Sequence, residues 1–355
     1  MIAWLGDGLR PGRPGALERE SPLAFDPRAP ERHRVAWIGE QPAAHALAMP
    51  VRAVAGHARL PLGLIGSVYA DPAHRGRGLA RACIEDAVSF LRGDGACAVL
   101  LWSDLDDFYA PLGFSPVGRD WLDVCDAAAI ARAMRAPRAA RVGAPSSVHL
   151  PALEALARGR AARIERPSFA LARMAAADGC ELVAAFAPDG APTAFAACGR
   201  GDDFHDVVHD WAGAPDGVLA CLDALARTRA AIGLLSPPGE QPASAPEGVV
   251  ARLRGAGATT VPRSLALARL IDAERLWEAA AHAHPALRAL RVDTRDAHVR
   301  LHSRAGTTSL DAPAFLRLVL GGLATAPPIA ATDAERVALA AALPLPLYVW
   351  GFDSI

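Results

Sequence analysis

One stretch in the first third of the chain, residues 68–80 (VYADPAHRGRGLA), constrains the fold more than any other. A strand-like apolar run, Leu62–Ala70, leads into it and stops before Pro72. The residues after the loop repeat with the period of a helix, whose apolar positions are Ala80, Cys83, Ile84, Ala87, Val88 and Leu91. A second apolar run, Ala96–Trp102, has the length of a buried parallel strand. The pattern therefore predicts a strand, loop, helix and strand, with the loop at the sheet edge where ligands bind in open α/β sheets.

The loop itself has the composition of an anion site. Gly76 and Gly78 let the backbone approach a ligand closely, and Arg75 and Arg77 supply charge that suits phosphate oxygens. The start of the following helix adds backbone N–H groups without intrahelical partners. The spacing matches neither the dinucleotide fingerprint nor the P-loop. A phosphate-binding turn and a solvated arginine- and glycine-rich loop both fit this composition.

A tyrosine follows the second strand of this unit, in the segment SDLDDFYAPLGF at residues 103–114. A tyrosine hydroxyl within hydrogen-bond reach of a leaving group can protonate it, so Tyr109 is a candidate general acid. The alternative is a core tyrosine whose hydroxyl is satisfied by the protein.

The spacing Arg75-x-x-Gly78-x-Ala80, followed by Tyr109 shortly before Gly113-Phe114, resembles the GNAT acetyltransferase superfamily. The resemblance implies that Tyr109 protonates the departing coenzyme A thiolate. It implies that Ser103 and Asp104 lie beside the thioester. It also implies that the coenzyme is held by backbone groups of Val68, Tyr69 and Ala70 and, at its pyrophosphate, by Arg75, Gly76, Arg77, Gly78, Leu79, Ala80 and Arg81.

The middle third repeats the order of elements without the loop. Strands at Glu181–Phe186, Thr193–Cys198 and Val207–Trp211 precede a helix at Val218–Ala231 and an apolar run at Ile232–Leu235. We interpret it as a diverged second copy that walls the active cleft and binds no coenzyme.

An acidic cluster lies within this copy, at Asp202, Asp203, Asp206 and Asp210, interleaved with His205 and His209. The cluster fits an acidic wall for a cationic amine or a plain solvated face. A metal is disfavoured because strand geometry separates residues four apart by about 13 Å.

The last third predicts a helix at Leu265–Ala281, strands at Val292–Leu301 and Thr307–Leu310, a helix between Asp311 and Gly321, and a helix at Asp333–Ala342. Pro237–Pro246 before it has the composition of an exposed loop. The arrangement resembles the sterol-carrier-like third domain of the enhanced-intracellular-survival-type acetyltransferases. The fold class expected is α+β, or mixed α/β, with tandem GNAT-like domains (the second degenerate) at residues 1–142 and 143–262 and the carrier-like domain at 263–355. The segment before Arg34 is short for the usual first strand and two helices.

The chain ends in an apolar, aromatic segment, residues 343–355 (LPLPLYVWGFDSI), which predicts a packed tail. In the resembled family the terminal carboxylate enters the active site and acts as the base. The resemblance thus implies that the Ile355 carboxylate, alone or with Asp353, takes the proton of the amine. A tail docked only for structural reasons is the alternative.

Composition narrows the function classes. The net charge of −1 gives no reason to expect nucleic acid or a membrane as partner. The six cysteines form no C-x-x-C pair, and the His282/His284 and His298/His302 pairs are weak metal candidates, so no metal is expected. With neither a signal-peptide pattern nor a membrane-length apolar run, the expected location is cytoplasmic.

Together these features predict an acetyl-CoA-dependent N-acetyltransferase with acetyl-CoA as co-substrate and a small amine as acceptor. A transferase of longer acyl groups and a non-catalytic acyl-CoA- or lipid-binding regulator are the alternatives. The resemblance also implies a homo-oligomer.

Overall fold

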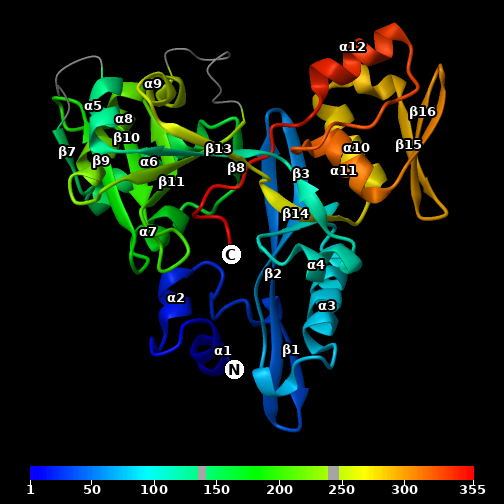
Figure 1. Ribbon diagram of the computed structural model, residues 1–355, viewed down its shortest axis with the longest axis horizontal. Coiled ribbons are helices and arrows are strands. Elements are labelled where there is room, and N and C mark those ends of the chain that lie inside the picture. Colours follow the sequence, from blue (N-terminus) through cyan, green and yellow to red (C-terminus); the bar gives the residue numbers. More distant parts are fainter. Residues whose placement is uncertain (135–140, 239–247) are drawn as a thin grey trace.

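The computed structural model describes residues 1–134, 141–238 and 248–355, and it arranges them around two large sheets and one small one (Figure 1). Most of the loop predicted at Pro237–Pro246 lies outside the described residues. None of the helices in the described part of the chain is long and apolar enough to cross a membrane.

The first sheet has the strand order β1-β2-β3-β4-β14-β5, with β8 paired to β2. Its long central strands carry residues that are fully buried on both faces, and α3 (Leu79–Gly93) packs on one of these faces through the predicted apolar stripe. The strands are β1 (His33–Ile38), β2 (Gln41–Ala55), β3 (Ala58–Ala70), β4 (Ala98–Leu101), β5 (Ser115–Val117), β8 (Ala162–Ile164) and β14 (Ala266–Leu270).

Part of the other face of this sheet is covered by the N-terminal residues. Leu5 of α1 (Ile2–Leu9) and Leu17 of α2 (Ala16–Glu20) pack against Leu47 of β2. Leu47 points away from α3 because neighbouring strand residues alternate between faces. A short 3-10 helix, η1 (Pro30–Arg32), then leads into β1.

The second sheet has the strand order β13-β6-β12-β11-β10-β9-β7 and repeats the parallel strand pair with an intervening helix. Its parallel pair, β11 and β12, flanks helix α8, as β3 and β4 flank α3. The strands are β6 (Asp120–Cys125), β7 (Arg141–Gly143), β9 (Glu181–Phe186), β10 (Pro192–Cys198), β11 (Val207–Gly213), β12 (Ile232–Ser236) and β13 (Thr259–Arg263). The helices are α5 (Ala127–Ala133), α6 (Leu150–Arg158), α7 (Ala170–Ala175), α8 (Pro215–Ala226) and α9 (Val249–Gly255).

The two sheets exchange strands. Strand β6 leaves the first third of the chain to pair with β12 and β13, whereas β14 returns to the first sheet and lies between β4 and β5. The helix predicted at Leu265–Ala281 is therefore wrong in its first part, because residues 266–270 form β14 and only Ala273–Ala283 form helix α10. Pairing on both edges overrides the helical preference of this Leu- and Ala-rich segment. The domain boundaries predicted at residues 142 and 262 stay predictions. Strand pairs such as β6 with β12 and β4 with β14 join residues on either side of them.

The last third forms a small sheet, β15 (Arg291–Arg295), β16 (His298–Ser303) and β17 (Gly306–Leu310), which contacts α10 and α11 (Ala312–Leu320). Helix α12 (Asp333–Ala342) packs on the short 3-10 helix η5 (Pro285–Ala289). The single strand predicted at Val292–Leu301 is wrong, because Asp296 and Ala297, both at positive φ, turn it into a hairpin. Two positive φ values are typical of a tight hairpin turn, but without a glycine this turn carries no strong sequence signal.

The tail, residues 343–355, leaves the third sheet and ends between the first two (Figure 1). Its aromatic side chains are buried, including Tyr348, Trp350 and Phe352. The tail is therefore packed, as its composition predicts.

Candidate active site

Strands β3 and β4 diverge towards their carboxyl ends. They pair in parallel only over Leu62–Leu64 of β3, although β3 continues to Ala70. The carboxyl half of β3, including Val68, Tyr69 and Ala70, thus keeps β2 on one side and has no strand on the other among the described residues. An unpaired strand edge can hydrogen-bond an extended ligand.

A bulge bends β3 at this point. The register with β2 shifts between His45 and Leu47, and Ser67 takes a φ of 47°. A non-glycine residue at positive φ is sparsely populated and needs support from its surroundings. His45 supplies support, because its Nδ1 lies 2.9 Å from the Ser67 carbonyl oxygen, which can only accept a hydrogen bond.

A second histidine completes this arrangement. His33 Nδ1 lies 3.0 Å from His45 Nε2, so a neutral His45 donates to Ser67 and accepts from His33. Burial lowers the pKa of His45 to about 4, which keeps the ring neutral at physiological pH. The roles of His33 and His45 could not be predicted from the sequence, because isolated histidines in neighbouring strands form no motif.

Beyond β3 the loop of residues 71–78 leads directly to the start of α3. Gly76 and Gly78 both have positive φ, and Gly78 is the N-cap residue of α3. The side chains of Arg75, Arg77 and Arg81 are exposed there. The structure therefore brings together free helix N–H groups, two glycines and arginines, which is a suitable surface for a phosphate.

Tyr109 lies on the same face of the first sheet as α3. It ends α4 (Asp106–Tyr109), is 6 % exposed, and packs edge-on against Phe108 and Phe114. Burial raises the pKa of its hydroxyl, and a hydrogen bond with the Ser103 side chain offsets this in part. The side chain is therefore a protonated donor at neutral pH. Asp104 is exposed in the turn between β4 and α4.

The last residue of the chain reaches β3 from the opposite end of the sequence. A Cβ built on Gly66 would lie 2.3 Å from a backbone oxygen of Ile355, so the two residues are in direct contact. Gly66 stands next to the strained Ser67. The terminal group thus lies against the bulge.

A buried ion network holds the tail in this position. Arg166 donates to both oxygens of Asp353, at 2.5 and 2.7 Å, and to Asp210 of β11 at 2.8 Å. Arg160 reaches the other oxygen of Asp210 at 2.5 Å. Burial disfavours ionised Asp210, but the two arginines outweigh it and lower its pKa to about 2. Both oxygens of Asp353 are occupied by Arg166, which leaves Asp353 poorly placed to act as a base.

Further contacts hold the tail between the first two sheets. Arg200, 3 % exposed, donates to the carbonyl oxygens of Gly351 and Ser354 at 2.7 and 2.8 Å. Trp350 packs edge-on against Trp211 of β11, and its indole N–H donates to Ala162.

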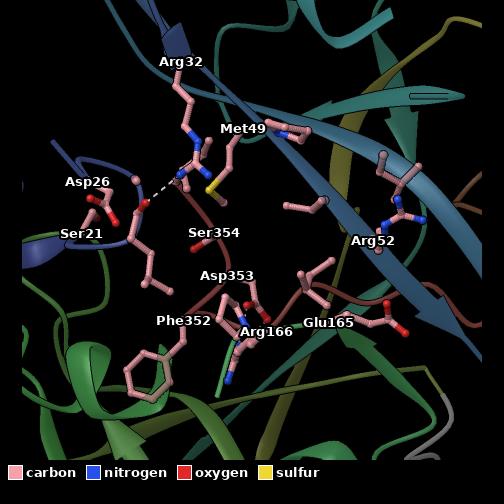
Figure 2. Close-up of a pocket in the computed structure, with 18 of the residues that line it drawn as sticks. Ser21, Asp26, Arg32, Met49, Arg52, Glu165, Arg166, Phe352, Asp353 and Ser354 are labelled. Atoms are coloured by element: carbon pink, nitrogen blue, oxygen red, sulfur yellow. Dashed lines mark hydrogen bonds and ion pairs between the residues drawn. The ribbon is translucent and has the colours of Figure 1, made fainter. Parts of the chain in front are cut away.

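A cavity of about 400 Å³ opens beside the end of the tail (Figure 2). It is lined by the N-terminal segment, β2, residues 164–169 and tail residues 352–355, and we call it the tail cavity. Its size is that of a small-molecule site.

Carboxylates of the acidic cluster in the second copy are paired with arginines. Asp202 and Asp203 pair with Arg13 and Arg10 of the N-terminal segment, and Asp210 belongs to the network above. Residues 207–213 are a strand, so His205 and His209 lack helical spacing. In the described parts of the chain, no three His, Cys, Asp or Glu side chains are grouped so as to hold a metal ion.

Comparison with known proteins agrees with this geometry. Residues 5–114, which include β1 to β4 and α3, match the model of the acetyltransferase (GNAT) family. No curated protein matches the sequence.

Solved structures match the fold over nearly the whole chain. A GCN5-related N-acetyltransferase from Anabaena variabilis aligns over 100 % of this chain and 97 % of its own, with a TM-score of 0.62 and 15 % identity. One from Kribbella flavida covers 90 % and 87 %, with a TM-score of 0.58 and 16 % identity. Eis1 from Mycobacterium abscessus covers 91 % and 90 %, with a TM-score of 0.56 and 18 % identity. The predicted mixed α/β fold with tandem GNAT-like units is confirmed, whereas the sterol-carrier-like identity of the last third stays a prediction.

Proposed function

We propose that this protein is an acetyl-CoA-dependent N-acetyltransferase that acetylates a small amine. The observation that carries the proposal is the parting of β3 from β4, which leaves the Val68–Ala70 edge unpaired and leads straight into the glycine loop. An extended pantetheine arm suits the strand edge, and a pyrophosphate suits the loop and the N-terminus of α3. The GNAT match over residues 5–114 supports the same assignment.

The transfer needs one proton removed and one supplied. A neutral amine nitrogen attacks the thioester carbonyl carbon, the C–N bond forms, and the C–S bond breaks as the thiolate leaves. Tyr109 is the proposed donor of the proton that the thiolate takes up. Its raised pKa suits this role, since the hydroxyl stays protonated until it is needed.

The terminal carboxylate of Ile355 is the proposed base. It lies against Gly66, on the strand that would carry the coenzyme, and it borders the tail cavity, where an amine could enter. A carboxylate there would take the proton that an ammonium must lose before it attacks.

The base assignment is tested by adding a Gly-Ser dipeptide after Ile355. The extension moves the terminal carboxylate away from Gly66, so kcat should fall by about 10²-fold while coenzyme A still binds. Undiminished turnover in a protein that binds coenzyme A normally would exclude the carboxylate as the base.

A lipid- or acyl-CoA-binding regulator is the second candidate, and one cavity favours it. A space of about 790 Å³ lies between α11, α12 and the start of the tail, and most of its lining is apolar. Thermal shifts with acetyl-CoA, myristoyl-CoA and fatty acids separate the candidates, because only a ligand of the native state raises its stability. A shift with fatty acids alone, without coenzyme A release from acetyl-CoA, would favour the regulator.

A further inference from the structure

The tail cavity contains charged groups that the acetyl transfer does not require. Four side-chain carboxylates line it, and three of them are bound to arginines. Asp26 accepts from Arg28 and Arg173, Asp353 from Arg166, and Glu165 from Arg59. The fourth, Asp94, is exposed at the end of α3. The side-chain carboxylates inside the cavity are therefore already neutralised.

Of the four arginines that line the cavity, Arg166 is bound to Asp353 and Asp210, whereas Arg32 and Arg52 lack such partners among the described residues. Arg32, half-buried, donates to the Leu23 carbonyl oxygen at 3.0 Å, and no carboxylate of the described residues lies within ion-pair distance of it. Figure 2 shows Arg32 reaching into the cavity beside Met49, on the side of Ser354. Arg52, exposed on β2, also lacks a carboxylate partner among the described residues.

A third guanidinium adds a buried donor. Arg200 holds the tail through its Nη atoms, but its Nε is buried without a hydrogen-bond partner. The Arg200 guanidinium also lies 4.0 Å from the Asp203 carboxylate. Arg200 thus lines the same cavity as Arg32 but is occupied by the tail and Asp203, which leaves Arg32 as the half-buried arginine without a carboxylate partner among the described residues.

Apolar side chains form much of the remaining lining, including Leu23, Met49, Ile164, Met174 and Phe352. Such a surface favours a ligand with an apolar body and disfavours a densely hydrated polycation.

From this arrangement, and resting on the proposed function, we infer that the acceptor amine carries both an apolar body and a carboxylate, as an apolar amino acid or short peptide does. Its carboxylate meets Arg32, with the exposed Arg52 as a further donor. Its apolar body packs on the Met49 and Phe352 side of the cavity, and its amine is left for the terminal carboxylate. A guanidinium binds a carboxylate through two parallel hydrogen bonds, which gives this recognition its specificity.

Calorimetric titration of L-phenylalanine, L-phenylalaninamide and spermidine tests the inference, with and without coenzyme A. We expect the acid to bind about 10-fold more tightly than its amide, which is the size of one charge-assisted hydrogen-bonded pair. In Arg32→Gln the ratio should fall towards one. The matched control Arg295→Gln, on the third sheet, should keep it.

The outcomes separate the inference from the proposed function. Equal affinity for acid and amide, absence of binding by both, tighter binding of spermidine, or a ratio that survives in Arg32→Gln would each overturn the inference. A failure of coenzyme A itself to bind would count against the proposed function, while the ratio measured without coenzyme A still decides the acceptor class.

Discussion

The connection from the parallel strand to the following helix differs between the two large sheets. In the first, β3 runs past the end of its pairing with β4, and residues 71–78 connect it to α3 with glycines and exposed arginines. In the second, Ala214 alone connects β11 to α8, whose first turn carries the acidic Asp216. An anion is therefore favoured at the first helix and disfavoured at the second.

The carboxyl half of the parallel strand differs as well. On β11 the carbonyl oxygens of His209 and Trp211 accept from Gly351 of the tail and from Arg160. On β3 the corresponding half, Val68–Ala70, has no strand on that side among the described residues, and the exposed Arg75 donates from its Nε to the Ala70 carbonyl oxygen at 3.4 Å. One unit therefore leaves its strand edge without a neighbouring strand, while the other uses its edge to hold the tail. We propose that coenzyme binding and the anchoring of the tail are a division of roles between the two units.

The proposed catalytic role of the first unit depends on Tyr109. Tyr109→Phe removes the proposed proton donor and should lower kcat by about 10²- to 10⁴-fold, with little change in coenzyme A affinity. Thiol release from acetyl-CoA measures the rate. The control Tyr348→Phe, in the tail beside the second unit, should keep the wild-type rate. Equal turnover in Tyr109→Phe would remove this residue from the mechanism.

The structural role of the second unit depends on Arg166. Arg166→Met leaves Asp353 buried without its partner and should destabilise the fold by about 3–5 kcal/mol. Denaturant unfolding measures this. Replacing Arg336, an exposed arginine paired with Asp333, by Met should cost less than about 1 kcal/mol. A similar small cost for Arg166→Met would mean that the network does not anchor the tail.

Buried histidines make both units sensitive to acid. Burial lowers the pKa values of His45 and His209 to about 4 in the folded protein. The unfolded chain binds these protons near pH 6.5, so stability is present above that pH and is lost as the pH falls towards 4, by on the order of 3 kcal/mol for each histidine.

His45→Gln and His209→Gln should each flatten the dependence of unfolding free energy on pH, and only His45→Gln should also weaken coenzyme A binding through the Ser67 bulge. Unchanged pH curves would show that neither ring is buried and neutral as described. Equal effects on coenzyme A affinity would contradict the division of roles.

The smallest effect concerns the loop. Arg75→Ala should weaken coenzyme A binding by about 10-fold through a lost phosphate contact, with no change in stability. The exposed Arg227 at the end of α8 serves as the matched control, since Arg227→Ala should leave the affinity unchanged. Wild-type affinity in Arg75→Ala would count against the pyrophosphate assignment.

Local patterns account for what the sequence could predict. The apolar stripe of α3 and the glycine loop follow from residues close in sequence, and so does the order of elements in the second sheet. The packed tail follows from its apolar composition.

Other features depend on contacts between distant segments. The insertion of β14 between β4 and β5 is decided by pairing across most of the chain, which is why a helix was expected there. Similarly, Arg166 and Asp353 meet only in the fold, and His45 becomes notable only because it supports Ser67. The roles of the individual site residues stay predictions.

A crystal structure with coenzyme A bound would test directly whether the first sheet binds the coenzyme beside Tyr109. We expect the pyrophosphate to bind the backbone N–H groups of Gly76–Arg81 and the pantetheine arm to lie along Val68–Ala70. The thiol should lie within hydrogen-bond reach of Tyr109. Coenzyme A bound at α8 of the second sheet, or with its thiol remote from Tyr109, would contradict it.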